Sequence, residues 1–137
     1  MTVTVEHLFA KVRRVAAEQS VTEGVAAMWV MTVAAMAMAQ DIPLNLRPAM
    51  AAAVDRWYAK TADHQSLEPA RVACWRFLDT KNGNSTTIDD PVDVAVRTLI
   101  CVLWDEADEG SDLATGLDFF TGLANRRGGL ELILGLT

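Results

Sequence analysis

The sequence has few of the residues that form disulfide or metal cross-links in small proteins. Its 137 residues include two cysteines, Cys74 and Cys101, and two histidines, His7 and His64. A structural zinc site needs about four nitrogen or sulfur ligands at short spacing, and no C-x-x-C or H-x-x-x-H pair exists here. Each cysteine lies inside an apolar run. We therefore expect two buried, reduced thiols, no metal and no cofactor.

Basic residues and membrane-length apolar runs are also scarce. Twelve Lys and Arg face eighteen Asp and Glu, a net charge of −6, which argues against nucleic acid as a partner. Residues 1–10 lack the cationic and apolar pattern of a secretory signal. The longest uncharged stretch, residues 24–40, is at the lower length limit for a bilayer span and is rich in Ala and Met. We expect a cytoplasmic protein that does not enter a membrane.

Catalytic motifs are missing as well. The chain has no G-x-S-x-G, H-E-x-x-H or G-x-x-x-x-G-K-[S/T] pattern, and neither histidine has a nucleophile beside it. Residues 89–93 spell D-D-x-x-D, which binds magnesium diphosphate in some helical enzymes. A helix start explains the same letters, with Asp90 as the N-cap and Asp93 near the positive helix end. We favour the helix start and predict that the protein is not an enzyme.

What is present is a helical pattern. Apolar residues make up 51% of the chain, enough for one domain over residues 1–137. They recur at helical spacing, and no stretch alternates with a period of two. The prediction is an all-α, single-domain bundle of about six helices around an apolar central helix (residues 21–39). The expected helices cover residues 3–18, 21–39, 47–61, 67–79, 91–105 and 111–125.

Local signals mark several helix starts. Ser20 and Glu23 match a capping box, Pro48 suits a first helical turn, and Asp90 precedes a proline as an N-cap should. Trp29 is expected in the core. The third helix is expected to bury a set of its larger side chains: Met50, Val54, Trp57 and Tyr58. Three tryptophans are also considered as partly exposed anchors at an interface with a partner: Trp57, Trp75 and Trp104.

Negative charge is concentrated in one segment. Residues 89–118 contain nine acids and one base, Arg97, and so carry −8, whereas the other 107 residues carry +2. Five of these acids fall within residues 105–112, a run that does not fit the calcium-loop spacing. The run is either a solvated turn or an acidic surface for a basic partner. The candidate partner-binding residues are Asp89, Asp93, Trp104, Asp105, Glu106, Asp108, Glu109 and Asp112.

Two further segments resemble a known group of proteins. Residues 70–81 read ARVACWRFLDTK and residues 96–106 read VRTLICVLWDE. This pattern resembles small bacterial immunity proteins of polymorphic-toxin and contact-dependent growth inhibition systems. The resemblance implies a cytoplasmic, non-enzymatic protein that binds and neutralises the C-terminal domain of a cognate toxin. Independently of it, Arg71 and Arg97 stand at the heads of apolar runs and are expected to pair with Asp79, Asp93 or other acids and so tie helices together.

Three functional hypotheses follow from these observations. The first is an immunity protein that binds a toxin domain, such as a nuclease, through the acidic surface. The second is a small regulatory or adaptor module that binds an endogenous basic protein or self-associates. The third is a helical enzyme that uses the carboxylates of residues 89–93 with magnesium. The sequence leaves open the toxin's activity, the place where the inhibitor binds on it, and the oligomeric state.

Overall fold

The protein is an all-α bundle, as predicted. The computed structural model describes residues 4–59, 67–82, 90–103, 117–118 and 120–122, and no strand occurs among them. These described ranges contain five α-helices: α1 (Val5–Gln19), α2 (Glu23–Ala37), α3 (Arg47–Ala53), α4 (Leu67–Asn82) and α5 (Pro91–Ile100). The short helical turns η1 (Ala39–Asp41) and η2 (Leu44–Leu46) join α2 to α3. The described residues between 117 and 122 are mostly helical and fall within the expected sixth helix.

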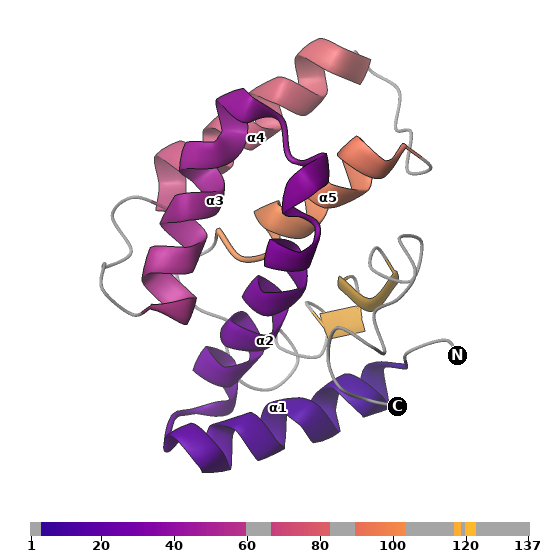
Figure 1. Ribbon diagram of the computed structural model, residues 1–137. Helices are drawn as coiled ribbons and strands as arrows, with labels where there is room; N and C mark the ends of the chain where they lie inside the picture. Colours follow the sequence, from indigo (N-terminus) through magenta and orange to yellow (C-terminus); the bar gives the residue numbers. More distant parts are fainter. Residues whose placement is uncertain (1–3, 60–66, 83–89, 104–116, 119, 123–137) are drawn as a thin grey trace.

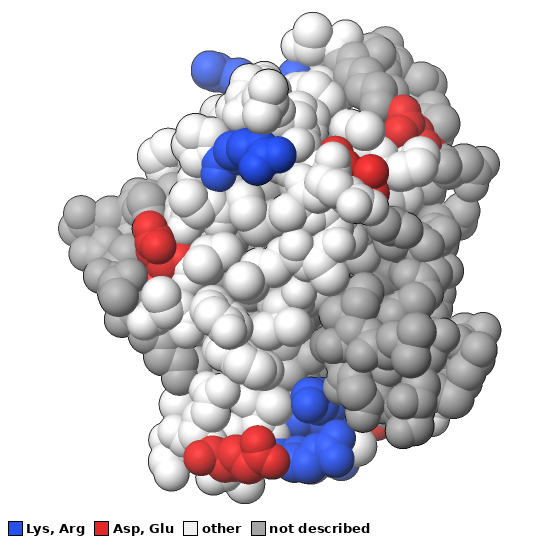
Figure 2. All heavy atoms as spheres, in the orientation of Figure 1, with Lys and Arg blue, Asp and Glu red and all other residues white. Residues whose placement is uncertain are grey.

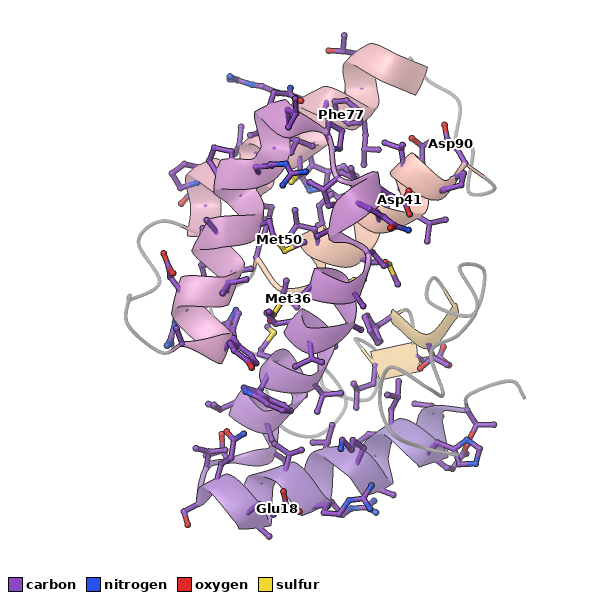
Figure 3. All side chains as sticks on the ribbon, in the orientation of Figure 1. Glu18, Met36, Asp41, Met50, Phe77 and Asp90 are labelled. Carbon is purple, nitrogen blue, oxygen red and sulfur yellow. The ribbon has the colours of Figure 1, made fainter. Side chains whose placement is uncertain are left out.

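The central position of α2 is confirmed. Figure 1 shows α2 running through the middle of the molecule, with α1 across one end and α3 and α5 on either side. Small residues on α2 let these neighbours approach closely, and methionines fill the remaining gaps. Met36 of α2 and Met50 of α3 lie between the two helices (Figure 3). The buried residues of α2 are Gly24, Ala26, Ala27, Met28, Val30, Met31, Thr32, Ala34 and Ala35.

The predicted capping box before α2 is wrong. Ser20 ends α1 in the left-handed conformation, with φ of 56°, and its N–H donates to the carbonyl of Ala16. The N-cap of α2 is Thr22, whose hydroxyl accepts a hydrogen bond from the N–H of Val25 at 3.2 Å. The two helices meet at 110°, so Ser20 must serve the turn and cannot also cap the second helix.

This arrangement makes a testable contrast between two neighbouring residues. Thr22→Ala should lower the free energy of unfolding by about 1 kcal/mol because it removes a helix cap. Ser20→Gly should raise it by about 0.5 kcal/mol, because glycine adopts the left-handed conformation without the steric cost of a Cβ. Urea denaturation measures both changes. If Ser20→Gly destabilised the protein as much as Thr22→Ala does, the result would support Ser20 as the cap of α2 after all.

The third helix departs from its prediction in its last turns. Pro48 lies in the first turn as expected, but the α-helix ends at Ala53 and a π-helical turn, η3 (Val54–Tyr58), continues it. The N–H of Ala59 donates to the carbonyl of Val54, five residues earlier. A π-turn shifts the residues that follow it to a new side of the helix. Within this turn Trp57 is buried, as expected, with 1% of its surface exposed, whereas Tyr58, also expected to be buried, is 46% exposed.

Helices α4 and α5 begin where the sequence predicts. Asp90 caps α5, and its carboxylate accepts a hydrogen bond from the N–H of Val92 at 2.9 Å. α5 ends at Ile100, five residues before its predicted end, and tight turns follow through residue 103. The N–H of Leu103 donates to the carbonyl of Ile100, a spacing of three that no longer continues an α-helix.

Candidate partner-binding site

The structure removes one residue from the predicted acidic surface. Asp93 was expected to face a partner, but it lies in the first turn of α5 and none of its surface is exposed. α5 is packed against both α2 and α4, so a side chain on its inner side is enclosed. Asp93 is therefore an interior residue of the bundle and does not contribute to a contact surface.

The other predicted contact residues lie outside the described residues. These are Asp89, Trp104, Asp105, Glu106, Asp108, Glu109 and Asp112. The acids that are described do not form a single patch. Figure 3 places Glu18 near the α1 end of the molecule and Asp41 and Asp90 near the opposite end. On the face in Figure 2, the described acidic side chains form several small groups, one of which adjoins basic side chains, and uncharged residues separate the groups.

The residues just before the acidic run are firmly held. The indole Nε1 of Trp57 donates to the carbonyl of Val102 at 2.7 Å. The guanidinium of Arg71, on α4, donates to the carbonyl of Leu103 at 2.9 Å. Both acceptor residues are fully buried. These bonds fix the chain two residues before Asp105 and replace the intrahelical partners that carbonyls at a helix end lack.

Arg71 thus ties α4 to the segment after α5, as expected, but the bond described here goes to the carbonyl of Leu103, three residues beyond α5, and not to an acid. Its neighbour in this role, Trp57, is itself supported by a stacked cation. The guanidinium carbon of Arg56 lies 4.3 Å from the centre of the Trp57 ring. The ring of Trp29, on α2, stacks on the ring of Tyr58, with 5.9 Å between the ring centres. Trp29 is partly buried and not fully in the core, where it was expected. The sequence did not indicate this cluster, because it depends on the π-turn.

Both thiols are free, and their apolar surroundings keep them protonated at neutral pH. Cys74 is buried and Cys101 is partly buried. Burial raises the pKa of each thiol from 9.0 to about 12. The Sγ of Cys101 also donates to the carbonyl of Arg97 at 3.4 Å. At neutral pH neither sulfur is a thiolate, so neither is an activated nucleophile or a ready metal ligand.

The raised thiol pKa values predict a loss of stability in alkali. Below pH 9 both thiols are neutral whether the chain is folded or unfolded. Between pH 9 and about 12 the thiols ionise in the unfolded chain only, so the free energy of unfolding falls as the pH rises. Denaturation at several pH values should show a shallower decline for Cys74→Ala combined with Cys101→Ala than for the unchanged chain. An equal decline in both proteins would show that the thiols do not carry this effect.

The histidines and the D-D-x-x-D segment have structural explanations where they are described. His7 completes a capping box at the start of α1: its N–H donates to the Thr4 hydroxyl, and its Nδ1 accepts from the N–H of Thr4 at 3.2 Å. Asp90 caps a helix and Asp93 is buried, whereas Asp89 and His64 lie outside the described residues. Within the described ranges, no three His, Cys, Asp or Glu side chains are grouped as metal ligands would be.

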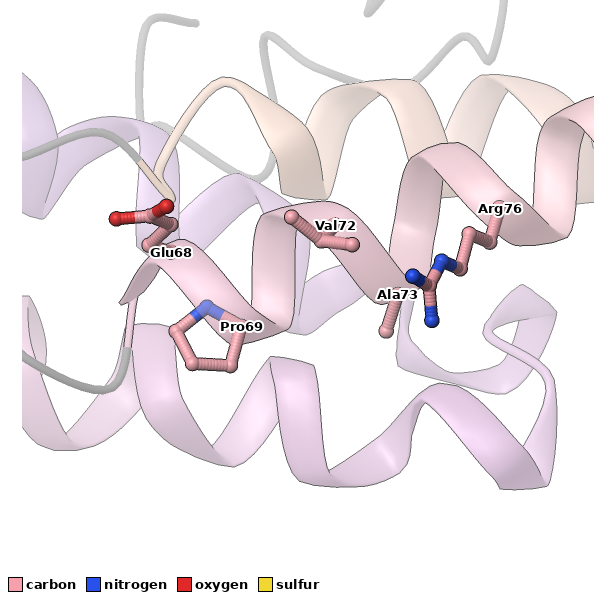
Figure 4. A pocket seen from close by; sticks show the side chains of 5 residues that line it. All are labelled: Glu68, Pro69, Val72, Ala73 and Arg76. Atoms are coloured by element: carbon pink, nitrogen blue, oxygen red, sulfur yellow. The ribbon is translucent and has the colours of Figure 1, made fainter.

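The outer side of α4 is a surface feature that the sequence analysis missed. Two adjoining hollows lie along it. One is lined by Glu68, Pro69, Val72, Ala73 and Arg76, and Figure 4 shows these side chains along the helix with Glu68 and Arg76 at the two ends. The second shares Ala73 and Arg76 and extends to Asn45 of η2. Exposed Trp75 was the one signal in the sequence that pointed to this side of the helix.

In the described part of the chain, no individual helix has both the length and the apolar character needed to cross a membrane; α1 and α2 meet the test only as a pair bent by 110°. Comparison of the chain with protein-family models, curated proteins and solved structures gave no match in any of the three.

Proposed function

We propose that this chain is an immunity protein, a cytoplasmic inhibitor without enzymatic activity that binds the C-terminal domain of a cognate antibacterial toxin. The observation that carries the proposal is the charge distribution along the sequence. Residues 89–118 hold a charge of −8, whereas the remaining chain carries +2. So local an excess of negative charge attracts a cationic partner, such as a nuclease whose cleft binds phosphates. The resemblance of residues 70–81 and 96–106 to immunity proteins adds the biological role.

The contact surface in this proposal consists of the acidic run, with Trp104 as an apolar anchor, and it also includes Asp89. Its acids are Asp105, Glu106, Asp108, Glu109 and Asp112. Asp93 is left out because it is buried. The hydrogen bonds from Trp57 and Arg71 support the choice, because they hold the chain at Val102 and Leu103, immediately before the run. A fixed starting point reduces the entropy that binding must remove from a contact segment.

Charge reversal in the acidic run tests the proposal. The variant changes Asp105, Glu106, Asp108 and Glu109 to Lys, and the partner used is the C-terminal domain of the protein encoded by the adjacent upstream gene. We expect the association rate constant to fall by about 10- to 100-fold at low salt, because steering is lost, and the difference to shrink as salt is added. Stopped-flow mixing measures the rate, and survival of cells that express the toxin domain measures protection.

A matched control separates the site of the charge from its amount. Changing Glu6, Glu18, Glu23 and Asp79 to Lys alters the net charge equally, from −6 to +2, at four exposed positions outside the run. Only the variant in the acidic run should lose fast association. An equal loss of fast association in both variants would mean that the net charge of the protein, and not the acidic run, sets the association rate. Unchanged binding in the first variant would remove the acidic surface, and failure of the unchanged chain to bind or protect would favour the adaptor hypothesis.

A further inference from the structure

The outward side of α4 exposes apolar side chains in a regular arrangement. We name as the α4 face the residues Glu68, Pro69, Val72, Trp75 and Arg76, all of which are exposed. Val72 is 39% exposed and Trp75 is 41% exposed. Single exposed apolar residues are common on protein surfaces, but here three follow one another along one side of a helix that borders a hollow. Trp and Arg are also the residues most enriched among binding hot spots.

The charges on the α4 face lie at its two ends. Glu68 is in the first turn of α4, and Arg76 follows two turns later, with the apolar residues between them. Neither side chain makes an ion pair or a hydrogen bond within the described part of the chain. One end of the face therefore presents an available carboxylate and the other end an available guanidinium.

These positions are symmetric about Val72. Glu68 and Arg76 lie four residues before and four residues after it, and Pro69 and Trp75 lie three before and three after. Two such helices packed antiparallel around a two-fold axis at Val72 would bring each Glu68 to the Arg76 of the other copy. Each Trp75 would then cover the other copy's Pro69. In a two-fold interface each contact occurs twice, so the face is complementary to itself.

We infer that the α4 face is the interface of a homodimer, occupied by α4 of a second copy of this chain. Helix geometry permits the pairing. At 1.5 Å per residue, Glu68 and Arg76 lie about 6 Å to either side of Val72 along the axis. Residues 68, 72 and 76 form one ridge of spacing four, the ridge that packs most often between helices at axial distances of about 8–10 Å. At that distance extended Glu and Arg side chains can meet in charge-assisted hydrogen bonds.

Charge-swap variants test this dimer in the full-length chain. Sedimentation equilibrium over a range of concentrations up to millimolar should show a dimer for the unchanged chain. Glu68→Arg or Arg76→Glu alone places two like-charged pairs in the interface, and each should raise the dimer dissociation constant by at least about tenfold. The double variant Glu68→Arg with Arg76→Glu restores both pairs and should dimerise again. An equimolar mixture of the two single variants should form a mixed dimer, since both of its pairs are then opposite in charge.

Controls keep the result specific to this surface. Glu18→Arg, at an exposed position on α1, should leave the dissociation constant unchanged. Circular dichroism and thermal melting of each variant establish that α4 remains folded after the change in its first turn. A monomer at every concentration for the unchanged chain would overturn the inference. So would single variants that still dimerise normally, or a double variant and a mixture that both remain monomeric after the single variants have lost the dimer.

Discussion

Replacing Trp57 with alanine should lower the free energy of unfolding by about 3–5 kcal/mol, a large share of the stability of a domain of this size. The residue is 1% exposed, donates to the carbonyl of Val102 and supports the Arg56 guanidinium on its ring. Truncation would leave a cavity between η3 and the end of α5 and remove the hydrogen bond at the same time. Urea denaturation followed by circular dichroism measures the loss.

Trp57→Phe separates the hydrogen bond from most of the packing. Phenylalanine keeps an aromatic ring but has no N–H, so the buried carbonyl of Val102 loses its indole donor. We expect a cost of about 1–3 kcal/mol beyond that of a conservative aromatic exchange. Trp75→Phe is the matched control: Trp75 is 41% exposed, and its replacement should change stability by less than about 0.5 kcal/mol. Equal effects of the two Phe variants would mean that the Trp57 hydrogen bond contributes nothing measurable.

Replacing Phe120 with alanine should have a comparable effect, about 3–5 kcal/mol. Phe120 and Leu117 are fully buried members of the hydrophobic core, although they lie more than fifteen residues after the end of α5. The C-terminal part of the chain thus supplies apolar groups that α1 to α5 alone would leave unpaired. Chemical denaturation with an unchanged m-value would show that the loss is one of stability and not of compactness.

Asp118 provides the control for Phe120 on the same stretch of chain. It is exposed, two residues away, and Asp118→Ala should alter the free energy of unfolding by less than about 0.5 kcal/mol. A cost below about 1 kcal/mol for Phe120→Ala, similar to that of the control, would contradict the central place of Phe120 in the core.

Local signals in the sequence predicted a helix start correctly where only one residue was suited to cap it. Asp90 before Pro91 predicts an N-cap, because the side-chain oxygen and the fixed proline φ both suit a first turn. The burial of most residues between 24 and 35 follows from their nearly uniform apolar character. Ser20 misled because Ser and Thr both cap helices, and the choice between Ser20 and Thr22 depends on the 110° turn between α1 and α2.

The features that the sequence did not reveal depend on contacts between distant segments. Trp57 is buried, whereas Tyr58, also expected to be buried, is exposed in the π-turn, and helical periodicity cannot signal a residue added to one turn. Aspartate is a residue type usually found on the surface, and Asp93 is enclosed only because α5 packs against α2 and α4. Of the predicted partner-binding residues, Asp93 alone lies among those described. The acidic surface therefore remains a prediction from charge.

The two hydrogen bonds at the end of α5 also bear on the order in which the chain folds. They join residues 45 and 32 positions apart in the sequence, whereas the caps of α1 and α2 join residues three apart. Closing a long loop costs chain entropy before any contact compensates it, so distant contacts form after local ones. During synthesis the N-terminal helices can form while Val102 is still inside the ribosome. The anchoring of the segment that precedes the acidic run is thus a late event, completed only after translation has passed α5.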